Sequence, residues 1–218
     1  MKKIRYSILF ISTLIVALII PSGMALSQND YRPMEDVEAF RSSMISASEN
    51  SLSIASDFEQ MKHLSFLEED VKSRGIFYFQ KENKLRWEYS DPFYYLIIFN
   101  NDTVLIQDEN NTNVYDAASG KMFRQINEIM LSMVNGSILE SDDFEFEYFE
   151  KPSSYKLELR PLDENMKEFL SKIHLFINKK DITVDELLML EKSGDYTRIH
   201  FINKRLNEEI PQHTFDLP

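Results

Sequence analysis

Residues 75–93 decide the fold, and they read GIFYFQKENKLRWEYSDPF. Four large apolar residues follow the glycine, and after a polar stretch apolar and polar residues alternate up to an Asp-Pro pair. A period of two places successive side chains on opposite faces, as in a β-strand, whereas a helix repeats every 3.6 residues. The stretch therefore predicts two strands of a sheet with an apolar face. The alternating residues of its second half are Leu85, Trp87 and Tyr89 against Arg86, Glu88 and Ser90.

The same pattern continues outward from this stretch. Residues 94–99 and 103–107 are apolar runs separated by a polar turn at residues 100–102. Short runs joined by tight turns are typical of an antiparallel meander, so we expect a large antiparallel sheet of about nine or ten strands. The later strands are predicted at residues 143–148, 155–160, 173–177, 183–190 and 196–203, with an extended segment near Phe215.

Two segments change to a helical period. Residues 34–48 carry apolar residues at spacings of three and four, which predicts a helix that continues toward Phe58 through Leu52 and Ile54. Residues 122–134 predict a second helix, ended by an Asn-Gly pair. Both helices are expected on the concave side of the sheet. Because no repeat or linker divides residues 26–218, we expect a single domain there.

The N-terminus has the pattern of a signal peptide. Lys2, Lys3 and Arg5 precede an apolar run over residues 8–20, and small residues follow a Pro-Ser-Gly break. An uncleaved anchor helix is the alternative, but about 13 apolar residues fall short of the roughly 20 that span a bilayer. We therefore expect cleavage after Ala25, which assigns residues 1–25 to the signal peptide and exports the rest.

Composition excludes several classes of protein. The 218 residues are 43% hydrophobic and 28% charged, too apolar for a disordered chain and too charged for a polytopic membrane protein. The formal net charge is -12, and removal of the three cations of residues 1–25 leaves 21 basic and 36 acidic residues, a net charge of -15. Such acidity argues against nucleic acid as a partner. The absence of cysteine excludes disulfides, thiol catalysis and cysteine-ligated metals.

No catalytic or cofactor motif is present. The sequence lacks the nucleophile-elbow, dinucleotide-binding, phosphate-loop and zinc-protease patterns, and its four histidines lie far apart. The acidic residues of 142–150 alternate with aromatic ones, which is typical of the solvated face of a strand. We therefore expect no enzyme activity, no cofactor and no metal. Sixteen phenylalanines, ten tyrosines and a methionine-bearing second helix favour instead an apolar binding site with a flexible lid.

Residues 75–93 closely resemble the signature of the LolA-like outer-membrane lipoprotein carrier proteins. The shared features are a glycine, an alternating aromatic strand, a basic residue before Asn, an Arg-Trp pair, an aromatic residue and a proline. The similarity returns at residues 173–178 and 194–197, and at Asn203, Asn207, Ile210 and Phe215. It implies an incomplete, unclosed antiparallel β-barrel of about 10–11 strands with helices plugging the concave side.

The resemblance also implies a function. Family members shelter the acyl chains of lipoproteins that cross the periplasm of Gram-negative bacteria. They take acylated lipoproteins from an inner-membrane ATP-driven lipoprotein-releasing complex and deliver them to an outer-membrane lipoprotein acceptor. A periplasmic monomer without nucleic-acid partners is therefore expected. Two alternatives stay open: the same fold serving another lipid, an envelope-stress sensor or lipid export, and an exported enzyme on a similar sheet.

Candidate site residues follow from the strand pattern and the resemblance. If odd positions face inward, the lipid-binding cavity is lined by Phe77, Phe79, Leu85, Trp87 and Tyr89, joined by Leu96 and Ile98 after a change of register at Pro92. A slip of one residue would exchange the two faces. A lid helix with Ile126, Ile129, Met130 and Met133 would fill the empty cavity.

The family's lid latch, an arginine that hydrogen-bonds the plugging helix, falls by spacing on Lys81, and Arg86 is the second candidate. A lysine lacks the planar fork of arginine, and Lys81 could equally be an exposed strand-end charge. Leu85 also lies where the family presents an apolar residue to the releasing complex.

Overall fold

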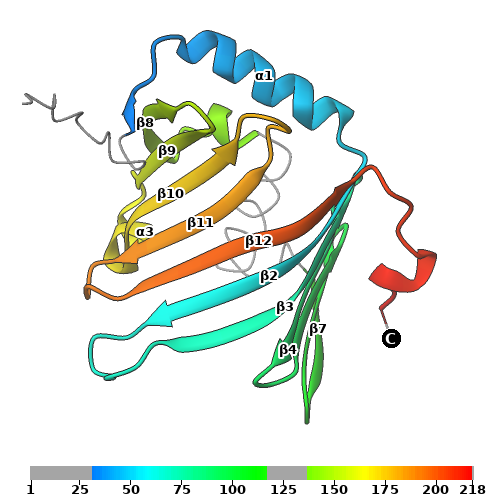
Figure 1. Ribbon diagram of the computed structural model, residues 1–218. Helices are drawn as coiled ribbons and strands as arrows, with labels where there is room; N and C mark the ends of the chain where they lie inside the picture. The colour runs from blue at the N-terminus through cyan, green and yellow to red at the C-terminus, as the bar shows by residue number, and fades with distance from the viewer. Residues whose placement is uncertain (1–30, 117–136, 218) are drawn as a thin grey trace, which may run out of the picture. The chain divides into compact units, whose positions relative to one another are not determined.

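One antiparallel sheet dominates the computed structural model, which describes residues 31–116 and 137–217. Its strands are arranged in the order β1-β8-β9-β10-β11-β12-β2-β3-β4-β5-β6-β7, so β1 and β7 form its two ends (Figure 1). The predicted unclosed antiparallel barrel is confirmed, with twelve strands instead of ten or eleven. The bounds are β1 Arg32–Pro33, β2 Ser53–His63, β3 Val71–Gln80, β4 Lys84–Asp91, β5 Tyr95–Asn100, β6 Thr103–Asp108, β7 Thr112–Asp116, β8 Phe144–Lys151, β9 Ser154–Pro161, β10 Leu170–Asn178, β11 Val184–Glu191 and β12 Tyr196–Leu206.

Two meanders build this sheet. The strands β2 to β7 follow one another in space as in sequence, and so do β8 to β12. The long pairing of β12 with β2, from Tyr196 opposite His63 to Leu206 opposite Ile54, joins the two meanders. Alternation along each strand therefore creates one continuous concave face and one convex face. The concave face carries most of the buried apolar side chains.

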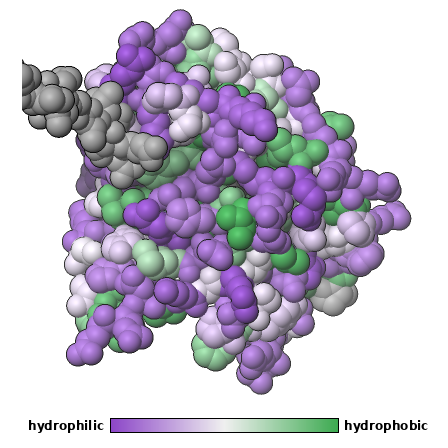
Figure 2. All heavy atoms as spheres, viewed as in Figure 1, coloured by the Kyte–Doolittle hydropathy of each residue, from purple (hydrophilic) through white to green (hydrophobic). Residues whose placement is uncertain are grey.

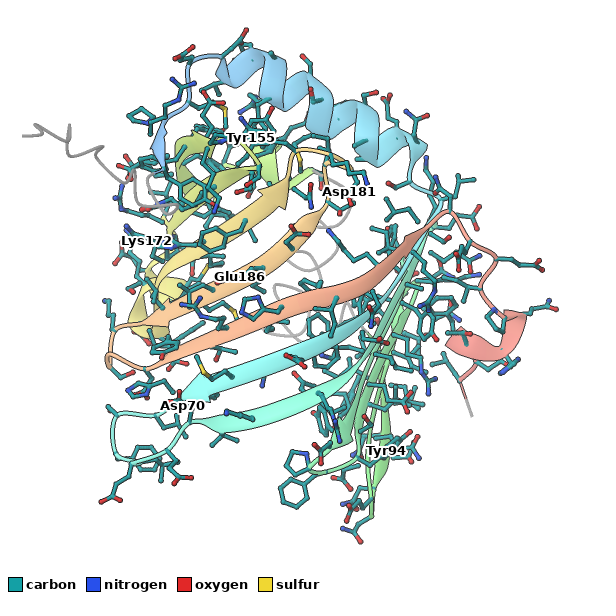
Figure 3. All side chains as sticks on the ribbon, in the orientation of Figure 1. Asp70, Tyr94, Tyr155, Lys172, Asp181 and Glu186 are labelled. Carbon is teal, nitrogen blue, oxygen red and sulfur yellow. The ribbon has the colours of Figure 1, made fainter. Side chains whose placement is uncertain are left out.

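The helix α1, Val37–Asn50, lies across one end of the sheet (Figure 1). Its first turn is capped by Asp36, whose carboxylate accepts a hydrogen bond of 2.9 Å from the backbone N–H of Ala39. Phe40 and Met44, four residues apart on one face, are the buried residues of the helix. The Phe40 ring meets Tyr155 of β9 edge-on, with ring centroids 4.6 Å apart, which anchors α1 to the sheet. Figure 3 shows Tyr155 directly beneath the helix.

The predicted extension of this helix toward Phe58 is wrong. The helix ends at Asn50, and Leu52 and Ile54 lie in the connection to β2 and in β2 itself. Ile54 and Phe58 are four residues apart, which fits one face of a helix and one face of a strand equally well. Packing decides between them, because Phe58 lies 4.9 Å from the Trp87 ring on the concave face.

Other elements also differ from the predictions. The segment near Phe215 is a 3₁₀ helix, η2 (Gln212–Phe215), instead of an extended strand. The strand β7, the helix α3 (Glu164–Phe169) and the 3₁₀ helix η1 (Ser137–Glu140) were not predicted. The predicted signal peptide and the predicted helix at residues 122–134 lie outside the described residues. Within the described residues, no helix combines the length and the apolar character that crossing a bilayer requires.

Close backbone approach fixes the junction of β3 and β4. A Cβ atom on Gly75 would lie 1.8 Å from the Glu88 carbonyl oxygen and 2.8 Å from the end of the Phe58 ring. Only glycine fits at this point, where the register between the two strands shifts. The glycine that opens the signature stretch therefore serves to bring β4 against β3.

The convex face of β4, β5 and β6 is covered by the C-terminal segment. Leu96, Ile98 and Leu105 form a small core there with Phe215, which is 4% exposed. Two side chains hold the segment in place: Arg86 donates a hydrogen bond of 3.0 Å to the Thr214 carbonyl, and Asn100 donates one of 3.1 Å to the Phe215 carbonyl. The chain thus fills this side of the sheet with its own residues.

Candidate functional site

A cavity of about 530 Å³ lies on the concave face, with α1 contributing to its wall. Its lining is mostly apolar and comes from β2 to β5, from β10 to β12, and from α1 and α3. The residues of α1 that line it beyond Met44 are small: Ala47, Ser48 and the cap residue Ser51. The molecular surface, in contrast, is mainly hydrophilic on the side shown in Figure 2, with apolar residues showing in separate patches. Apolar lining inside a hydrophilic exterior is the arrangement of a site for an apolar ligand.

Aromatic rings form the wall of the cavity around Trp87. The indole is 5.4 Å from the Phe77 ring and 5.9 Å from the Phe201 ring, both in edge-on arrangements. The Tyr89 ring lies 6.4 Å from the indole. Large rings with few rotatable bonds keep a wall in place when no ligand is bound. The cavity is therefore bounded by a preformed surface on the β3–β4 side.

Four of the seven predicted cavity residues line the cavity: Phe77, Leu85, Trp87 and Tyr89. Phe79 is buried in the same core but is not among the described lining residues. Leu85 is 0% exposed, so it cannot present its side chain to a partner at the surface in this conformation.

The prediction that Leu96 and Ile98 face the cavity is wrong. Both side chains lie on the convex face, in the core around Phe215. The pairing of Tyr89 with Tyr95 and of Trp87 with Ile97 keeps odd positions on the concave face through the turn, so Ile97 takes the predicted place. The change of register assumed at Pro92 does not occur.

Sequence reasoning also missed most of the opposite wall. Leu187 and Met189 of β11 and Ile199 and Phe201 of β12 line the cavity. Their period of two marks them as one face of a strand, and a signal was therefore present. The local sequence pattern does not show that β12 pairs with β2. That pairing places this face of β11 and β12 opposite Trp87.

A polar pair marks the end of the cavity away from α1. The Tyr89 hydroxyl donates a hydrogen bond of 2.9 Å to the Gln60 side-chain oxygen. Burial raises the pKa of Tyr89 to about 12, partly offset by the neighbouring Trp87, so the phenol stays neutral at physiological pH. The indole N–H of Trp87 is buried beside the Tyr89 hydroxyl and makes no hydrogen bond of good geometry to any of the described residues.

Two charged residues belong to the described lining, Glu191 and Lys204. Glu191 lies 3.7 Å from the Lys62 ammonium, toward the end of the sheet away from α1. The Lys204 side chain is 11% exposed and forms an ion pair with Asp185. Both charges are therefore compensated within the chain.

The two latch candidates lie on different sides of the sheet. The Lys81 ammonium, on the β3–β4 turn, donates a hydrogen bond of 2.9 Å to the Glu49 carbonyl in the last turn of α1. Asn207 donates one of 3.1 Å to the neighbouring Asn50 carbonyl. Arg86 instead points to the convex face, where it contacts Glu88 and Thr214, and so it does not contact α1. The predicted lid residues Ile126, Ile129, Met130 and Met133 lie outside the described residues.

A cluster of ionisable side chains also lies on the convex face. Burial tends to raise the pKa of Glu158, but hydrogen bonds of 2.8 Å from Lys156 and 2.5 Å from Lys172 outweigh it and lower the pKa to about 2. Burial lowers the pKa of the neighbouring His174, which Glu158 partly offsets. In residues 31–116 and 137–217 no group of three or more His, Asp and Glu residues could hold a metal ion.

Comparisons with known proteins agree with this geometry. Residues 49–218 match the family model of the outer membrane lipoprotein carrier protein LolA. No curated protein matches the sequence.

Among solved structures, an uncharacterized conserved protein from Thermus thermophilus is similar over 82% of this chain and 92% of its own, with 12% identity and a TM-score of 0.51. The MucA/MucB complex of Pseudomonas aeruginosa matches over 82% of this chain and 60% of that chain, with 10% identity and a TM-score of 0.50. A LolA superfamily protein from Nitrosomonas europaea matches over 81% and 97%, with 11% identity and a TM-score of 0.43. At such identities the likeness concerns the fold alone.

Proposed function

Because this chain belongs to the LolA family, we propose that it is a periplasmic carrier that shelters the acyl chains of lipoproteins in its concave cavity. It receives them from an inner-membrane ATP-driven releasing complex and hands them to an outer-membrane acceptor. The observation that carries this proposal is the apolar cavity of about 530 Å³ between α1 and the sheet. Its volume falls within the roughly 300–1,000 Å³ of typical ligand sites.

The binding energy of such a site comes mainly from moving the hydrocarbon of the ligand out of water. Each methylene moved from water into an apolar lining gains about 0.8 kcal/mol, so a sixteen-carbon chain gains on the order of 12 kcal/mol before costs. A carrier must also release its cargo, and a plug that competes for the same space lowers the net affinity. We assign this role to the segment with Ile126, Ile129, Met130 and Met133. Crosslinking that segment to the sheet through engineered cysteines is then expected to abolish uptake.

In the same mechanism, the contact between Lys81 and helix α1 is weak enough to open and close. Lys81 holds the last turn of α1 by one hydrogen bond, and its side chain is exposed to water. A cation at a helix C-terminus contributes about 0.3–1 kcal/mol, which is enough to bias a closed state but not to lock it. Lys81 acts in this proposal as a weak latch that yields when acyl chains displace α1.

Cargo identification tests the function directly. The full-length protein is purified from its native envelope under mild conditions, and the bound molecules are identified by mass spectrometry. Acylated proteins in stoichiometric amounts would support the carrier function. A single free lipid class without acylated protein would favour the same fold serving another lipid, and a regulatory protein without any acyl chain would favour stress sensing. Either of the last two results would overturn the proposal.

The cavity itself is tested with the variant Ile97→Trp, which fills it from the β5 wall. Its matched control is Ile98→Trp on the neighbouring residue, which faces the other side of the sheet. Loss of co-purified cargo in the first variant only is expected. Equal cargo in both variants would show that the bound chains lie elsewhere.

A further inference from the structure

The strands β11 and β12 separate before they end. Their ladder runs from Leu190 opposite Tyr196 to Glu186 opposite His200 and stops there. From Phe201 onward β12 continues beside β2, whereas Val184 pairs with Ile177 of β10. Figure 1 shows β11 and β12 diverging toward the end of the sheet that α1 crosses. The continuous sheet therefore has a lateral split on one side of the cavity, which we call the β11–β12 split.

This split opens onto the cavity. Ile182, Thr183 and Val184 lie on its β11 side and Phe201 and Lys204 on its β12 side, and all five line the cavity. From α1, Ser48 and Ser51 belong to the same lining. Figure 3 shows Asp181 below α1 at this end, with Glu186 farther along β11. Hydroxyl groups and one ammonium group therefore lie at this edge of a mostly apolar cavity, whereas the opposite end carries the Tyr89–Gln60 pair and Glu191.

A bulge in β12 aims Lys204 across the split. Ile202 pairs with Asp57 and Arg205 with Ala55, so two residues of β12 stand opposite Ser56 alone. The first of them, Asn203, has a φ of 54°, which is typical of such a bulge. Without the extra residue, the alternation from Phe201 would place position 204 on the convex face. The bulge turns Lys204 to the concave side instead.

Lys204 bridges the two sides of the split. Its ammonium lies 2.5 Å from the Thr183 hydroxyl and 3.4 Å from the Val184 carbonyl, and it forms an ion pair with Asp185. A second acidic group, Asp181, is 3.8 Å away. Ile182, between these residues, has a φ of 54°, a strained value for a β-branched side chain. Side-chain contacts therefore close the gap that the backbone ladder leaves open, and such contacts can be exchanged for others.

The polar groups at the split can hydrogen-bond the linkages of an acylated ligand. Its hydrocarbon gains from burial, whereas its ester or amide linkages lose hydrogen bonds to water unless new partners replace them. The lysine ammonium, with three donors, and the threonine hydroxyl are suited to such carbonyl groups. Asp185 and Asp181 offset the charge of Lys204, so the lysine can serve a ligand as a hydrogen-bond donor.

We propose that the β11–β12 split is the port through which the polar end of an acylated ligand leaves the cavity, with Lys204 and Thr183 as hydrogen-bonding groups at its edge. This inference rests on the proposed function and names the route and the ligand class for the same cavity: molecules that carry acyl chains on ester or amide linkages. The acyl chains lie inside, and the extended polar part passes between β11 and β12 below α1.

Locking each end of the cavity tests the port. The chain has no cysteine, so the variant Asp185→Cys/Lys204→Cys can be bridged with a short bis-maleimide without side reactions. Its matched control is Lys62→Cys/Glu191→Cys, because these two side chains contact each other at the opposite end. Binding of two probes is measured before and after bridging: palmitate, whose carboxylate is small, and a synthetic palmitoylated decapeptide, whose peptide must protrude.

Bridging at the split is expected to abolish binding of the palmitoylated peptide and to leave palmitate binding intact. Bridging at the opposite end is expected to leave the binding of both probes intact. Retention of the peptide after bridging at the split, or its loss only after bridging at the opposite end, would overturn the port. If unmodified protein bound neither probe, the proposed function itself would fail.

Bridging at the split could abolish the binding of both probes by closing the whole cavity, and a second variant tests the port in that case. Lys204→Met keeps the length of the side chain and removes its hydrogen bonds and its charge. Release of the palmitoylated peptide, followed by stopped-flow fluorescence, is expected to become about tenfold faster, the effect of losing one hydrogen bond to a charged group. Unchanged release from this variant would overturn the port.

Discussion

The two faces of β4, β5 and β6 differ in what covers them. The concave face presents Leu85, Trp87 and Ile97 to a cavity, whereas the convex face buries Leu96 and Ile98 under the chain's own Phe215. Both faces are apolar, so the alternation along the strands does not distinguish them. The difference teaches that an apolar face contributes to stability where the chain covers it, and to binding where the chain leaves room.

Hydrogen bonds add to the closure of the covered face. On the convex side the Thr214 and Phe215 carbonyls at the end of the chain accept from Arg86 and Asn100. Each such bond contributes about 0.5–1.5 kcal/mol, and somewhat more where the donor is charged. The convex face of these strands is therefore held closed by the chain's own residues.

The largest expected effect concerns the junction on which both faces depend. Gly75→Ala places a Cβ atom 1.8 Å from the Glu88 carbonyl oxygen, a backbone atom that no side-chain rotation can move. We expect the loss of unfolding free energy to exceed the roughly 1–3 kcal/mol of ordinary overpacking, with little folded protein at about 37 °C. Urea denaturation followed by circular dichroism measures it. Ser73→Ala on the same strand is the control, and equal stability of the two variants would contradict the prediction.

The next largest effect is expected on the convex face of β4, β5 and β6, which Phe215 covers. Phe215→Ala removes the side chain that Leu96, Ile98 and Leu105 pack against, and such truncations cost about 3–5 kcal/mol. Ligand affinity at a temperature where the variant is folded is expected to stay unchanged, because the cavity lies on the other face. His213→Ala, an exposed neighbour in η2, should affect neither quantity. A fall in affinity without a fall in stability would reverse the assignment of the two faces.

Adjacent residues sharpen the comparison further. Ile98→Trp overfills a closed core and is expected to reduce stability by about 1–3 kcal/mol, with palmitate affinity unchanged. Ile97→Trp extends into the cavity, so it should cost less stability than Ile98→Trp and should reduce palmitate affinity. Calorimetry of binding and thermal unfolding of both variants measure the two quantities. The opposite pattern would mean that the hollow side of the sheet is the one that carries Ile98.

That pair also shows how far the sequence could lead. Alternation predicted most of the strands and the inward Phe77, Leu85, Trp87 and Tyr89, and the resemblance predicted the unclosed barrel. The strands β1, β2 and β7 were not predicted. It could not place Leu96 and Ile98, because a strand buried on both faces reads as apolar throughout and its facing depends on the length of the preceding turn. Nor could it reveal Lys204, whose inward direction depends on a one-residue bulge at Asn203. In both cases the pairing between strands decides which face a side chain lies on, and the local sequence pattern does not show that pairing.

A pH-dependent effect distinguishes the charged part of the convex face. Hydrogen bonds from Lys156 and Lys172 lower the pKa of Glu158 from 4.5 to about 2 in the folded protein. Stabilisation from this carboxylate is therefore complete above about pH 4.5 and is lost as the pH falls toward 2. The Glu158→Gln variant should lose less unfolding free energy over this range than the natural protein. Parallel acid-unfolding profiles of the two proteins would contradict the role assigned to Glu158.

The smallest expected effect lies at the rim of the concave face. Lys81→Met removes the hydrogen bond to the Glu49 carbonyl while keeping the length of the side chain, and an exposed cation at a helix C-terminus is worth about 0.3–1 kcal/mol. Stability should fall by no more than that, and palmitate uptake, measured by stopped flow, should become faster because α1 opens more readily. Lys81→Arg is expected to restore slow uptake, and Lys72→Met, an exposed change in strand β3, to leave it unaltered. If all three variants took up palmitate at the natural rate, the contact with α1 would be a surface interaction without a part in gating, and opening of the hollow face would depend on other residues.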